Sequence, residues 1–386
     1  MAVEYDPFSY QIHEDPYPIY RRLRDEAPAY YNEAHGFWAL SRYDDVRAAL
    51  LDHGTYCSGQ GFLLEDVEDF ILPMMIGMDP PDHTRLRSTI NRALTPRQVS
   101  VLEATIRERA RDLLGGFVEH GSADLIADFG ALLPMAVIAQ MLGVPEADRD
   151  ELRLLADQMV HRDDSHRGVP ETGKQAAGRI YAYFEQMLAA RGTSDDQDLL
   201  SLLLAAEKAG EISHVEILGF CFLLIIAGNE TTTKLIGNMA CQLSAHGDQK
   251  GRLLADRSLI GNTIEEVLRF DTSTHMMART LTRDVELHGK TMEKGRKVAL
   301  LLASANRDER HWPRADQLDI TRDTKDHVAF GVGVHHCLGA ALARMEARVA
   351  LEEMLSSMPD FAVDTAGLER IHSGNVRGYA KVPITF

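Results

Sequence analysis

The sequence predicts a mainly α-helical fold with a minor β-sheet region. Several long segments repeat apolar residues at helical spacing, whereas strand-like segments are short and few. Such sparse strands cannot build a doubly wound parallel sheet. The chain has 386 residues, is 45% hydrophobic and contains no Gly/Ser linker or repeat. We therefore expect residues 1–386 to form a single domain.

Apolar periodicity locates the elements in order along the chain. The helical segments are 98–119, 131–142, 176–190, 214–245 and 259–270. The strand-like segments are 36–43, 278–289, 297–304 and the final KVPITF. The turn around Lys294 and Gly295 is expected to pair the second strand segment with the third.

Composition and charge exclude several classes of protein. Lys plus Arg number 41 and Asp plus Glu 58, so the net charge of −17 argues against a nucleic-acid binder and against docking to an anionic membrane. The longest apolar run, 217–227, is shorter than the ~20 residues that span a bilayer. The N-terminus has no signal-peptide pattern. With four cysteines in no disulfide-like or zinc-like spacing, we expect a cytoplasmic protein without a membrane anchor.

Cys337 has an unusual setting among the cysteines. It lies in Phe330-Gly-Val-Gly-Val-His-His-Cys-Leu-Gly339, directly before AALARMEARVALEEML, a strong helix sequence. A helix N-terminus favours a thiolate, and glycines permit close approach to a flat partner. From these residues alone, a structural turn with a buried cysteine is an equally open interpretation. Adjacent His335 and His336 point apart and do not predict a zinc site.

The segment resembles the haem-thiolate loop of the cytochrome P450 family, FxxGxHxCxG with Ala-Arg shortly after. The matching residues are Phe330, Gly333, His335, Cys337, Gly339, Ala343 and Arg344. The resemblance implies the cytochrome P450 fold and a haem b cofactor. Cys337 would be the axial ligand of the iron, with Phe330, Gly331, His335 and Gly339 around the haem. Thiolate ligation favours cleavage of the O–O bond.

Glu266-x-x-Arg269 lies on a helical segment well before Cys337. Residues at i and i+3 share a helix face, and such a pair taken alone is usually a solvated surface pair. In this order it resembles the family's ExxR pair, which would brace the cysteine loop structurally. Gln317 stands where the family usually has a third, cationic member. Gln317 can still hydrogen-bond to Glu266 or Arg269.

Ala227-Gly-Asn-Glu-Thr231 interrupts the apolar helical segment, although Gly within a helix costs about 1 kcal/mol relative to Ala. It resembles the family's [AG]GxxT oxygen-binding kink, in which Ala227 and Gly228 would border the haem. Glu230 would then deliver protons, and Thr231 would hydrogen-bond to the bound O₂. A packing notch is the alternative that the residues alone leave open.

Several cationic side chains lie upstream of the Cys337 loop. His83-Thr-Arg-Leu-Arg87 resembles the family's HxxxR element, whose side chains pair with a haem propionate. Arg279 occupies the position of a second propionate partner, and His335 would be a third. Arginine binds carboxylates bidentately. Taken singly, each is more simply interpreted as a surface cation, but five motifs in order extend the resemblance over nearly the whole chain.

The resemblance implies a monooxygenase that uses O₂ and two electrons to hydroxylate or epoxidise an apolar small molecule. No flavin or iron–sulfur segment accompanies the motifs, so we expect a separate ferredoxin and its reductase to supply electrons to a monomer. A basic patch on segments 83–97 and 340–355 would receive an acidic ferredoxin. Its arginines are Arg85, Arg92, Arg97, Arg344 and Arg348. The alternatives are a haem-thiolate peroxygenase or isomerase and a non-catalytic haem- or ligand-binding protein.

The family's substrate-contacting regions predict the pocket of this chain. Their residues here are Phe62, Leu63, Ile71, Met74, Leu223, Ile226, Ala227, His275, Met276, Ile371 and His372. Methionines predict a plastic apolar lining, although ordinary core is the alternative for the apolar members. The polar segment 154–177 is expected to form a lid. We expect a terpenoid, steroid or polyketide-like substrate.

Overall fold

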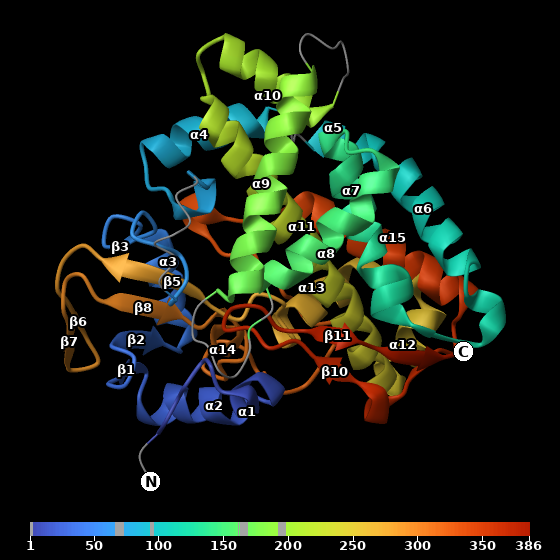
Figure 1. Ribbon diagram of the computed structural model, residues 1–386. Helices are drawn as coiled ribbons and strands as arrows, with labels where there is room; N and C mark the ends of the chain where they lie inside the picture. Colours follow the sequence, from blue (N-terminus) through green and yellow to red (C-terminus); the bar gives the residue numbers. More distant parts are fainter. Residues whose placement is uncertain (1–2, 66–72, 93–95, 161, 163–168, 192–197) are drawn as a thin grey trace.

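The computed structural model describes residues 3–65, 73–92, 96–160, 162, 169–191 and 198–386, with only the backbone at 96–98. Helices fill the top and right of Figure 1, and the largest sheet lies at the left. The α-helices are α1 (Tyr10–Glu14), α2 (Tyr17–Glu26), α3 (Tyr43–Leu51), α4 (Asp82–Asn91), α5 (Pro96–Val101), α6 (Glu103–Gly115), α7 (Leu132–Leu142), α8 (Glu146–Val160), α9 (Glu171–Arg191), α10 (Leu199–Lys208), α11 (His214–Ala245), α12 (Gly247–Ala255), α13 (Ile260–Phe270), α14 (Leu302–Ala305) and α15 (Ala340–Ser357).

The strands are short, as the sequence predicts. They are β1 (Ala29–Asn32), β2 (Phe37–Leu40), β3 (Tyr56–Cys57), β4 (Ser122–Asp124), β5 (Met277–Leu281), β6 (Val285–Leu287), β7 (Lys290–Met292), β8 (Lys297–Leu300), β9 (Ala362–Val363), β10 (Glu369–Arg370), β11 (Tyr379–Lys381) and β12 (Pro383–Thr385). The main sheet has the order β1-β2-β8-β5-β3, with β2 and β8 parallel. Antiparallel pairing of β5 with β8, Ala278 opposite Ala299, confirms the predicted strand pair.

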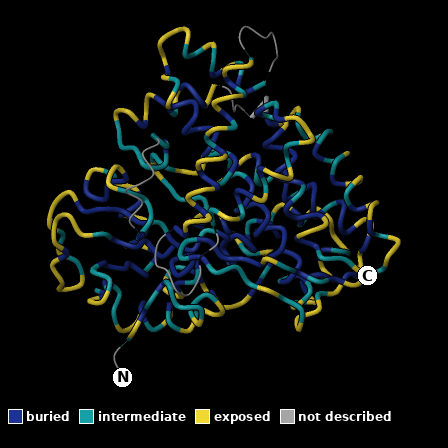
Figure 2. Tube along the Cα trace, in the orientation of Figure 1, coloured by how far each residue is buried: buried dark blue, intermediate teal, exposed yellow. Residues whose placement is uncertain are grey.

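Helix α11 occupies the predicted segment 214–245 and passes through the buried interior (Figure 2). A capping box starts it: Ser213 Oγ accepts the Glu216 N–H, and the Glu216 carboxylate accepts the Ser213 N–H. Arg85 of α4 forms an ion pair with the same carboxylate. By length and composition α11 could cross a membrane, but 61% of its most apolar window is buried inside the protein.

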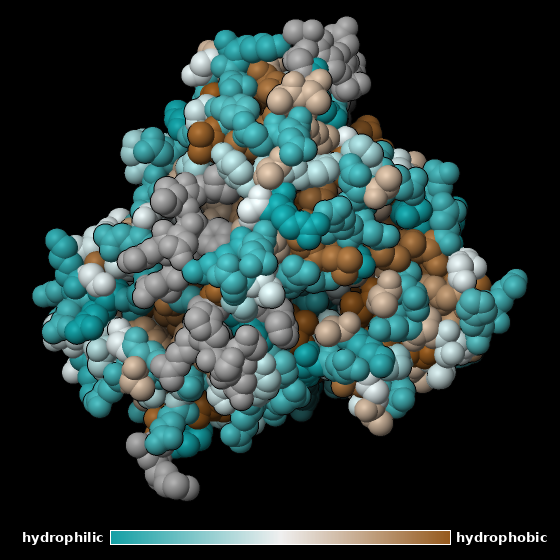
Figure 3. Space-filling model, in the orientation of Figure 1, coloured by the Kyte–Doolittle hydropathy of each residue, from teal (hydrophilic) through white to brown (hydrophobic). Residues whose placement is uncertain are grey.

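The predicted helix 98–119 is divided in the structure. The Leu102 N–H donates to the Val99 carbonyl, a tight turn that ends α5 before α6 begins. The helices pack around one large apolar cluster, and two smaller clusters lie on the faces of the main sheet. The described surface of the face in Figure 3 is mostly hydrophilic, with apolar atoms in separate groups.

Candidate functional site

A cavity of about 390 Å³ lies between the middle of α11 and the segment that holds Cys337. This volume is within the usual range of ligand pockets, about 300–1,000 Å³. Most of the residues predicted for a site line this one cavity. They are Phe62, Leu63, Met74, His83, Arg87, Leu223, Ile226, Ala227, Gly228, Glu230, Thr231, Arg279, Phe330, Gly331, His335, Cys337 and Gly339.

The Cys337 loop is fixed by its backbone. The Cys337 N–H donates to the Phe330 carbonyl at 2.8 Å, and α15 starts three residues after the thiol. Gly333 has φ 75°, and a Cβ at this position would lie 3.0 Å from the Leu50 carbonyl oxygen, so a larger residue does not fit. The Cys337 side chain is deep in the protein yet accessible, because it borders the cavity.

The helix end does not by itself ionise this thiol. Burial raises the pKa of Cys337, and this effect outweighs the opposing hydrogen bond from the Gly339 backbone and the charges of Arg87 and Arg344. The backbone at the helix N-terminus favours the thiolate, as the sequence predicts, but burial has the larger effect on the pKa of Cys337, and the thiolate stays a prediction. A bound metal ion would also favour the thiolate form.

Glu266 and Arg269 form a buried pair, as the sequence predicts for a structural brace. Both side chains are 0% exposed, and Arg269 Nε donates to Glu266 Oε2 at 2.8 Å. The remaining Arg269 donors reach backbone carbonyls of the chain that leads to the cysteine loop, at Asn306 (2.8 Å) and Ala315 (3.0 Å). The pair thus ties α13 to this chain with every charge satisfied.

The third member of the brace is Arg322, which the sequence comparison with the family motif missed. Arg322 Nε donates to Glu266 Oε1 at 3.2 Å. Gln317 contributes its backbone carbonyl, which accepts from Arg269 and Arg322, and in the described structure its side chain has no hydrogen bond to the pair. The prediction that the Gln317 side chain could complete the brace is wrong, because a guanidinium five residues later reaches the carboxylate.

The predicted cationic edge of the cavity has a different character. His83 is 1% exposed, and neither of its ring nitrogens has a hydrogen-bond partner in the described structure. Arg279 donates to the Ala278 carbonyl, and Arg87 to the Val334 carbonyl. Within the described ranges, neither arginine forms an ion pair.

Burial controls the protonation of this edge. It lowers the pKa of Arg279 to about 10, so the side chain is still charged at neutral pH. Burial and the nearby Arg279 charge lower the pKa of His335 to about 3, and burial also lowers the pKa of His83. At this edge, the charged guanidiniums of Arg87 and Arg279 therefore lie beside the neutral imidazoles of His83 and His335, and their donors suit the carboxylates of a ligand.

The opposite wall is the middle of α11. The Thr231 hydroxyl donates to the Ala227 carbonyl at 2.8 Å, while Glu230 pairs with Lys234 at 3.2 Å. A Cβ at Gly228 would lie 2.9 Å from Ile138 Cδ1 of α7, so this glycine is also a packing notch. Because α11 continues without interruption, the predicted kink does not break the helix.

Two carboxyl groups near this wall were missed by the sequence analysis. Glu346 of α15 lines the cavity, and burial raises its pKa well above the usual value, so it is uncharged. Asp157 of α8 forms an ion pair with Arg153 at 3.1 Å, and burial and the nearby Glu230 raise the pKa of Asp157. Both lie far from α11 in the sequence, and no motif distinguishes them from surface acids.

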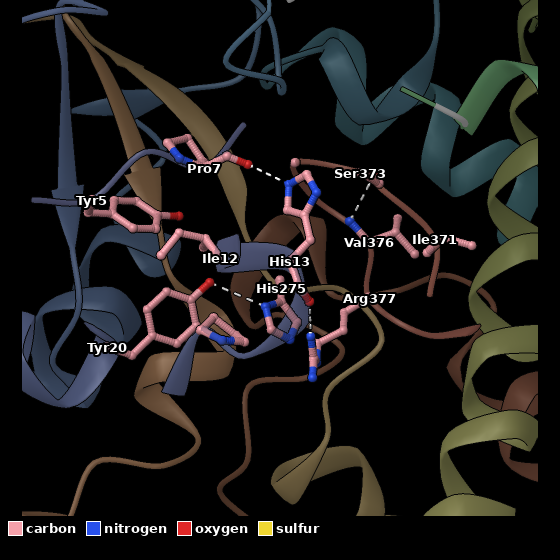
Figure 4. Close-up of a pocket in the computed structure, with 12 residues that line it drawn as sticks. Tyr5, Pro7, Ile12, His13, Tyr20, His275, Ile371, Ser373, Val376 and Arg377 are labelled. Atoms are coloured by element: carbon pink, nitrogen blue, oxygen red, sulfur yellow. Dashed lines mark hydrogen bonds between the residues drawn. The ribbon is translucent and has the colours of Figure 1, made fainter. Parts of the chain in front are cut away.

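Four residues predicted to line the pocket lie elsewhere. His275 and Ile371 border a separate cavity of about 20 Å³, where His275 Nδ1 lies 3.2 Å from the Tyr20 hydroxyl (Figure 4). Met276 packs in the cluster on one face of the main sheet, and His372 stacks on Tyr10.

Side-chain alternation explains part of this correction. Neighbouring residues of an extended chain point to opposite sides. Met277, the first residue of β5, therefore lines the large cavity in place of Met276. Ile71 and most of the central part of the predicted lid lie outside the described residues.

The predicted basic patch is largely neutralised by ion pairs. Arg344 contacts Glu265 and Arg348 contacts Glu103, each at 2.7 Å. Arg85 and Arg92 pair with Glu216 and Glu211. The side chain of Arg97 is outside the described structure. The expectation of a free basic surface is therefore wrong for the four described arginines, because carboxylates of neighbouring helices reach them.

The cavity fits the haem that the cysteine motif implies. Its walls are apolar, its edge offers unpaired guanidiniums to carboxylates, and a single thiol faces its interior. Among the described residues, no group of three or more His, Cys, Asp or Glu side chains could hold a metal ion. A metal at Cys337 would therefore take its other ligands from a non-protein group such as a porphyrin.

Comparison with known proteins gives consistent matches. The family model described as Cytochrome P450 matches residues 242–365. Putative cytochrome P450 123 of Mycobacterium tuberculosis is 42% identical over 98% of this chain and 96% of its own length. Vitamin D(3) 25-hydroxylase of Pseudonocardia autotrophica is 40% identical over 99% and 96%. The structure of CYP109E1 from Bacillus megaterium in complex with testosterone has a TM-score of 0.91 and 30% identity, covering 98% of this chain and 99% of that one.

Proposed function

Because the chain belongs to the cytochrome P450 family and is a monooxygenase of that family, we propose that it holds haem b through Cys337 and oxidises an apolar substrate of steroid size. The cavity carries this proposal: one thiol faces an apolar space whose edge has charged donors without carboxylate partners in the described structure. The name of the 40% identical hydroxylase and the testosterone complex of the 30% identical structure support a steroid-like substrate.

Different residues around the cavity would contact different parts of the cofactor. Arg87 and Arg279 would pair with its carboxylates, and His83 and His335 would donate hydrogen bonds to them as neutral imidazoles. When bound, the haem supplies the iron that activates O₂ and oxidises the substrate. Gly331 and Gly339 would leave room for its flat face beside Cys337.

The wall on the side of α11 would orient the substrate and exclude water. Leu223 and Ile226 present apolar side chains from α11, and Phe62 and Met74 face the cavity from the segment before α4. A flexible methionine can adapt to substrates of different outline. An apolar lining also strengthens the electrostatic interactions of the polar groups that remain inside it.

Thr231 and Glu230 would move protons into the cavity. The Thr231 hydroxyl now donates to the Ala227 carbonyl, so it must rotate before it can donate into the cavity. Glu230 lies beside it, is buried and is stabilised as a carboxylate by its ion pair with Lys234. General acid catalysis by such a group typically accelerates a step by about 10²–10⁴-fold.

Electrons come from redox partners in this family, and we propose a ferredoxin and its reductase for a monomeric, cytoplasmic, single-domain enzyme. The ion-paired arginines on α4 and α15 argue that docking does not depend on a simple excess of positive charge. On docking, these arginines would leave their carboxylates in this chain and pair with carboxylates of the ferredoxin. Such an exchange preserves specificity and makes the association rate depend on salt.

The absorption spectrum of the reduced protein under CO tests the proposal. Thiolate ligation predicts a strongly red-shifted Soret band, and Cys337→Ser should lose that shift. Cys241→Ser is the matched control, because this cysteine is buried near the end of α11, does not line the cavity and should leave the band unchanged. A Soret band typical of histidine ligation in the wild type would contradict the assignment of Cys337.

A further inference from the structure

Ser58 contacts a residue at the charged edge of the cavity but does not line the cavity itself. It follows β3, which pairs with β5 so that Cys57 lies opposite Thr280. The Asp79 carboxylate accepts the backbone N–H groups of Ser58 and Gly59, each at 2.8 Å. Ser58 is 1% exposed, so its hydroxyl is closed to solvent. These contacts hold the Ser58 side chain in one place.

The hydroxyl of Ser58 contacts the imidazole of His335, which lines the cavity. Ser58 Oγ lies 3.1 Å from His335 Nε2. The other ring nitrogen, Nδ1, has no hydrogen bond in the described structure. A neutral imidazole carries one hydrogen, on either nitrogen. The hydrogen bond at Nε2 therefore decides whether Nδ1 is a donor or an acceptor.

Two arrangements of hydrogens fit the contact between Ser58 and His335. In the first, the Ser58 O–H donates to Nε2, and the ring hydrogen is on Nδ1. In the second, the Nε2–H donates to Ser58 Oγ, and the hydroxyl hydrogen has no acceptor, since this hydroxyl makes no other hydrogen bond in the described structure. A buried donor without an acceptor is unfavourable, so we expect the first arrangement to dominate by about tenfold or more.

The charges around His335 give this choice a consequence for binding. The guanidiniums of Arg87 and Arg279 line the same edge of the cavity, and the ring of His83 lies 4.3 Å from that of His335 between centroids. A carboxylate attracted by the guanidiniums would meet an N–H in the first arrangement and a lone pair in the second. The N–H would form a charge-assisted hydrogen bond, whereas the lone pair would repel the carboxylate.

We propose that Ser58 is a positioning residue that fixes His335 as its Nδ1–H tautomer, so that this imidazole donates a hydrogen bond to a carboxylate at the charged edge of the cavity. This inference rests on the proposed function, because the carboxylates there would be those of the haem. Ser58 fixes only the position of one hydrogen, and the imidazole stays neutral. No motif of the sequence indicates this serine.

His327 provides an internal reference with the opposite tautomer. Its Nδ1 accepts the Ala329 N–H at 3.2 Å, so the ring hydrogen of the neutral imidazole is on Nε2. This Nε2–H donates to Glu265 Oε2 at 2.9 Å. The two histidines should therefore give opposite protonation patterns in one sample.

The ¹⁵N NMR spectrum of the histidine-labelled, reduced CO complex tests the tautomer at about pH 8, where even an unperturbed imidazole is neutral. His335 should carry its hydrogen on Nδ1 and His327 on Nε2, and substitution of each histidine by Gln identifies its signals. Ser58→Ala should shift His335 toward a mixture of tautomers and leave His327 unchanged, whereas Ser58→Thr, which retains the hydroxyl, should keep the wild-type pattern. A wild type with the hydrogen on His335 Nε2 would overturn the proposal, as would an unchanged His335 in Ser58→Ala.

The rate of haem transfer to an acceptor protein gives the second measurement. Ser58→Ala should lose haem about three- to tenfold faster than the wild type, since one hydrogen bond to a carboxylate is weakened. Ser356→Ala is the matched control, because the Ser356 hydroxyl donates to the Glu352 carbonyl at an exposed site and does not line the cavity. A wild-type rate in Ser58→Ala would overturn the proposal. A wild type without the red-shifted CO band would instead overturn the proposed function, and NMR of the purified protein would still show whether Ser58 fixes the tautomer of His335.

Discussion

The brace around Glu266 and the edge of the cavity both bury arginines, but only the brace supplies them with partners. Arg269 is 0% exposed and has a carboxylate and several carbonyls as acceptors. Arg279 is similarly buried, but among the described residues it finds only a backbone carbonyl. Its pKa is lowered to about 10, because the cost of burying the charge exceeds what the nearby Asp79 returns without forming an ion pair.

This difference distinguishes buried arginines that stabilise the fold from buried arginines that are placed to bind a ligand. Buried charges with internal partners stabilise one arrangement of the chain, whereas buried charges without them await a partner from outside. The same criterion applies to the imidazole of His83, whose two nitrogens have no partner in the described structure. Three experiments test this difference between the brace and the edge of the cavity.

Removal of the brace charge should have the largest effect. Glu266→Gln leaves the Arg269 guanidinium buried without its counter-charge, and breaking such a pair typically costs about 3–5 kcal/mol. Urea unfolding of the purified protein should show this loss with or without haem. Arg314→Gln is the control, because Arg314 is 68% exposed and 3.9 Å from Asp319, and it should change stability by less than about 0.5 kcal/mol. Equal effects of the two variants would contradict the brace.

The second experiment asks which residue completes the brace. Arg322→Gln removes donors to Glu266 and to three backbone carbonyls, and an acceptor left unpaired costs about 1–3 kcal/mol. Gln317→Ala should be nearly neutral, since the backbone carbonyl of this residue makes the contacts. Unfolding midpoints of the two variants decide between them. A larger loss in Gln317→Ala would show that the Gln317 side chain completes the brace.

In the third experiment, one substitution should leave the haem-free protein as stable or more stable, and should weaken the retention of haem. Arg279→Leu removes an unpaired buried charge, so the haem-free protein should be as stable as wild type or more stable. The same variant should lose haem faster, by about tenfold, which corresponds to about 1.4 kcal/mol. Thermal unfolding of the haem-free protein and transfer of haem to an acceptor protein measure the two effects. Destabilisation of both states would assign Arg279 to the architecture.

Local sequence patterns predicted the parts of the fold that depend on interactions between residues close together in the sequence. The span of α11 follows from its apolar run and capping residues, and the pairing of β5 with β8 from strand-like segments around a turn. The ExxR pair and the cysteine loop were also located, because short spacings specify one helix face and one tight turn. The confirmation of the cytochrome P450 fold shows how much ordered motifs convey.

Long-range contacts account for the errors. The phase of side-chain alternation next to β5 decided whether Met276 or Met277 reached the cavity. Arg344 appeared free in the sequence until α13 brought Glu265 to it. The raised pKa of Asp157 depends on the packing of α8 on α11, which buries its carboxyl near Glu230. In each case the deciding partner comes from an element that local spacing cannot place.

The two contacts of Glu216 restrict which substitutions related sequences can accept at this position. Its carboxylate closes the capping box of α11 and also pairs with Arg85 on α4, the helix that carries His83 and Arg87. One side chain thus holds the start of the helix that lines the cavity and the helix at its charged edge. A change at Glu216 disturbs both contacts at once, and no single compensating substitution restores both. Positions 85, 213 and 216 are therefore expected to covary as a group of three.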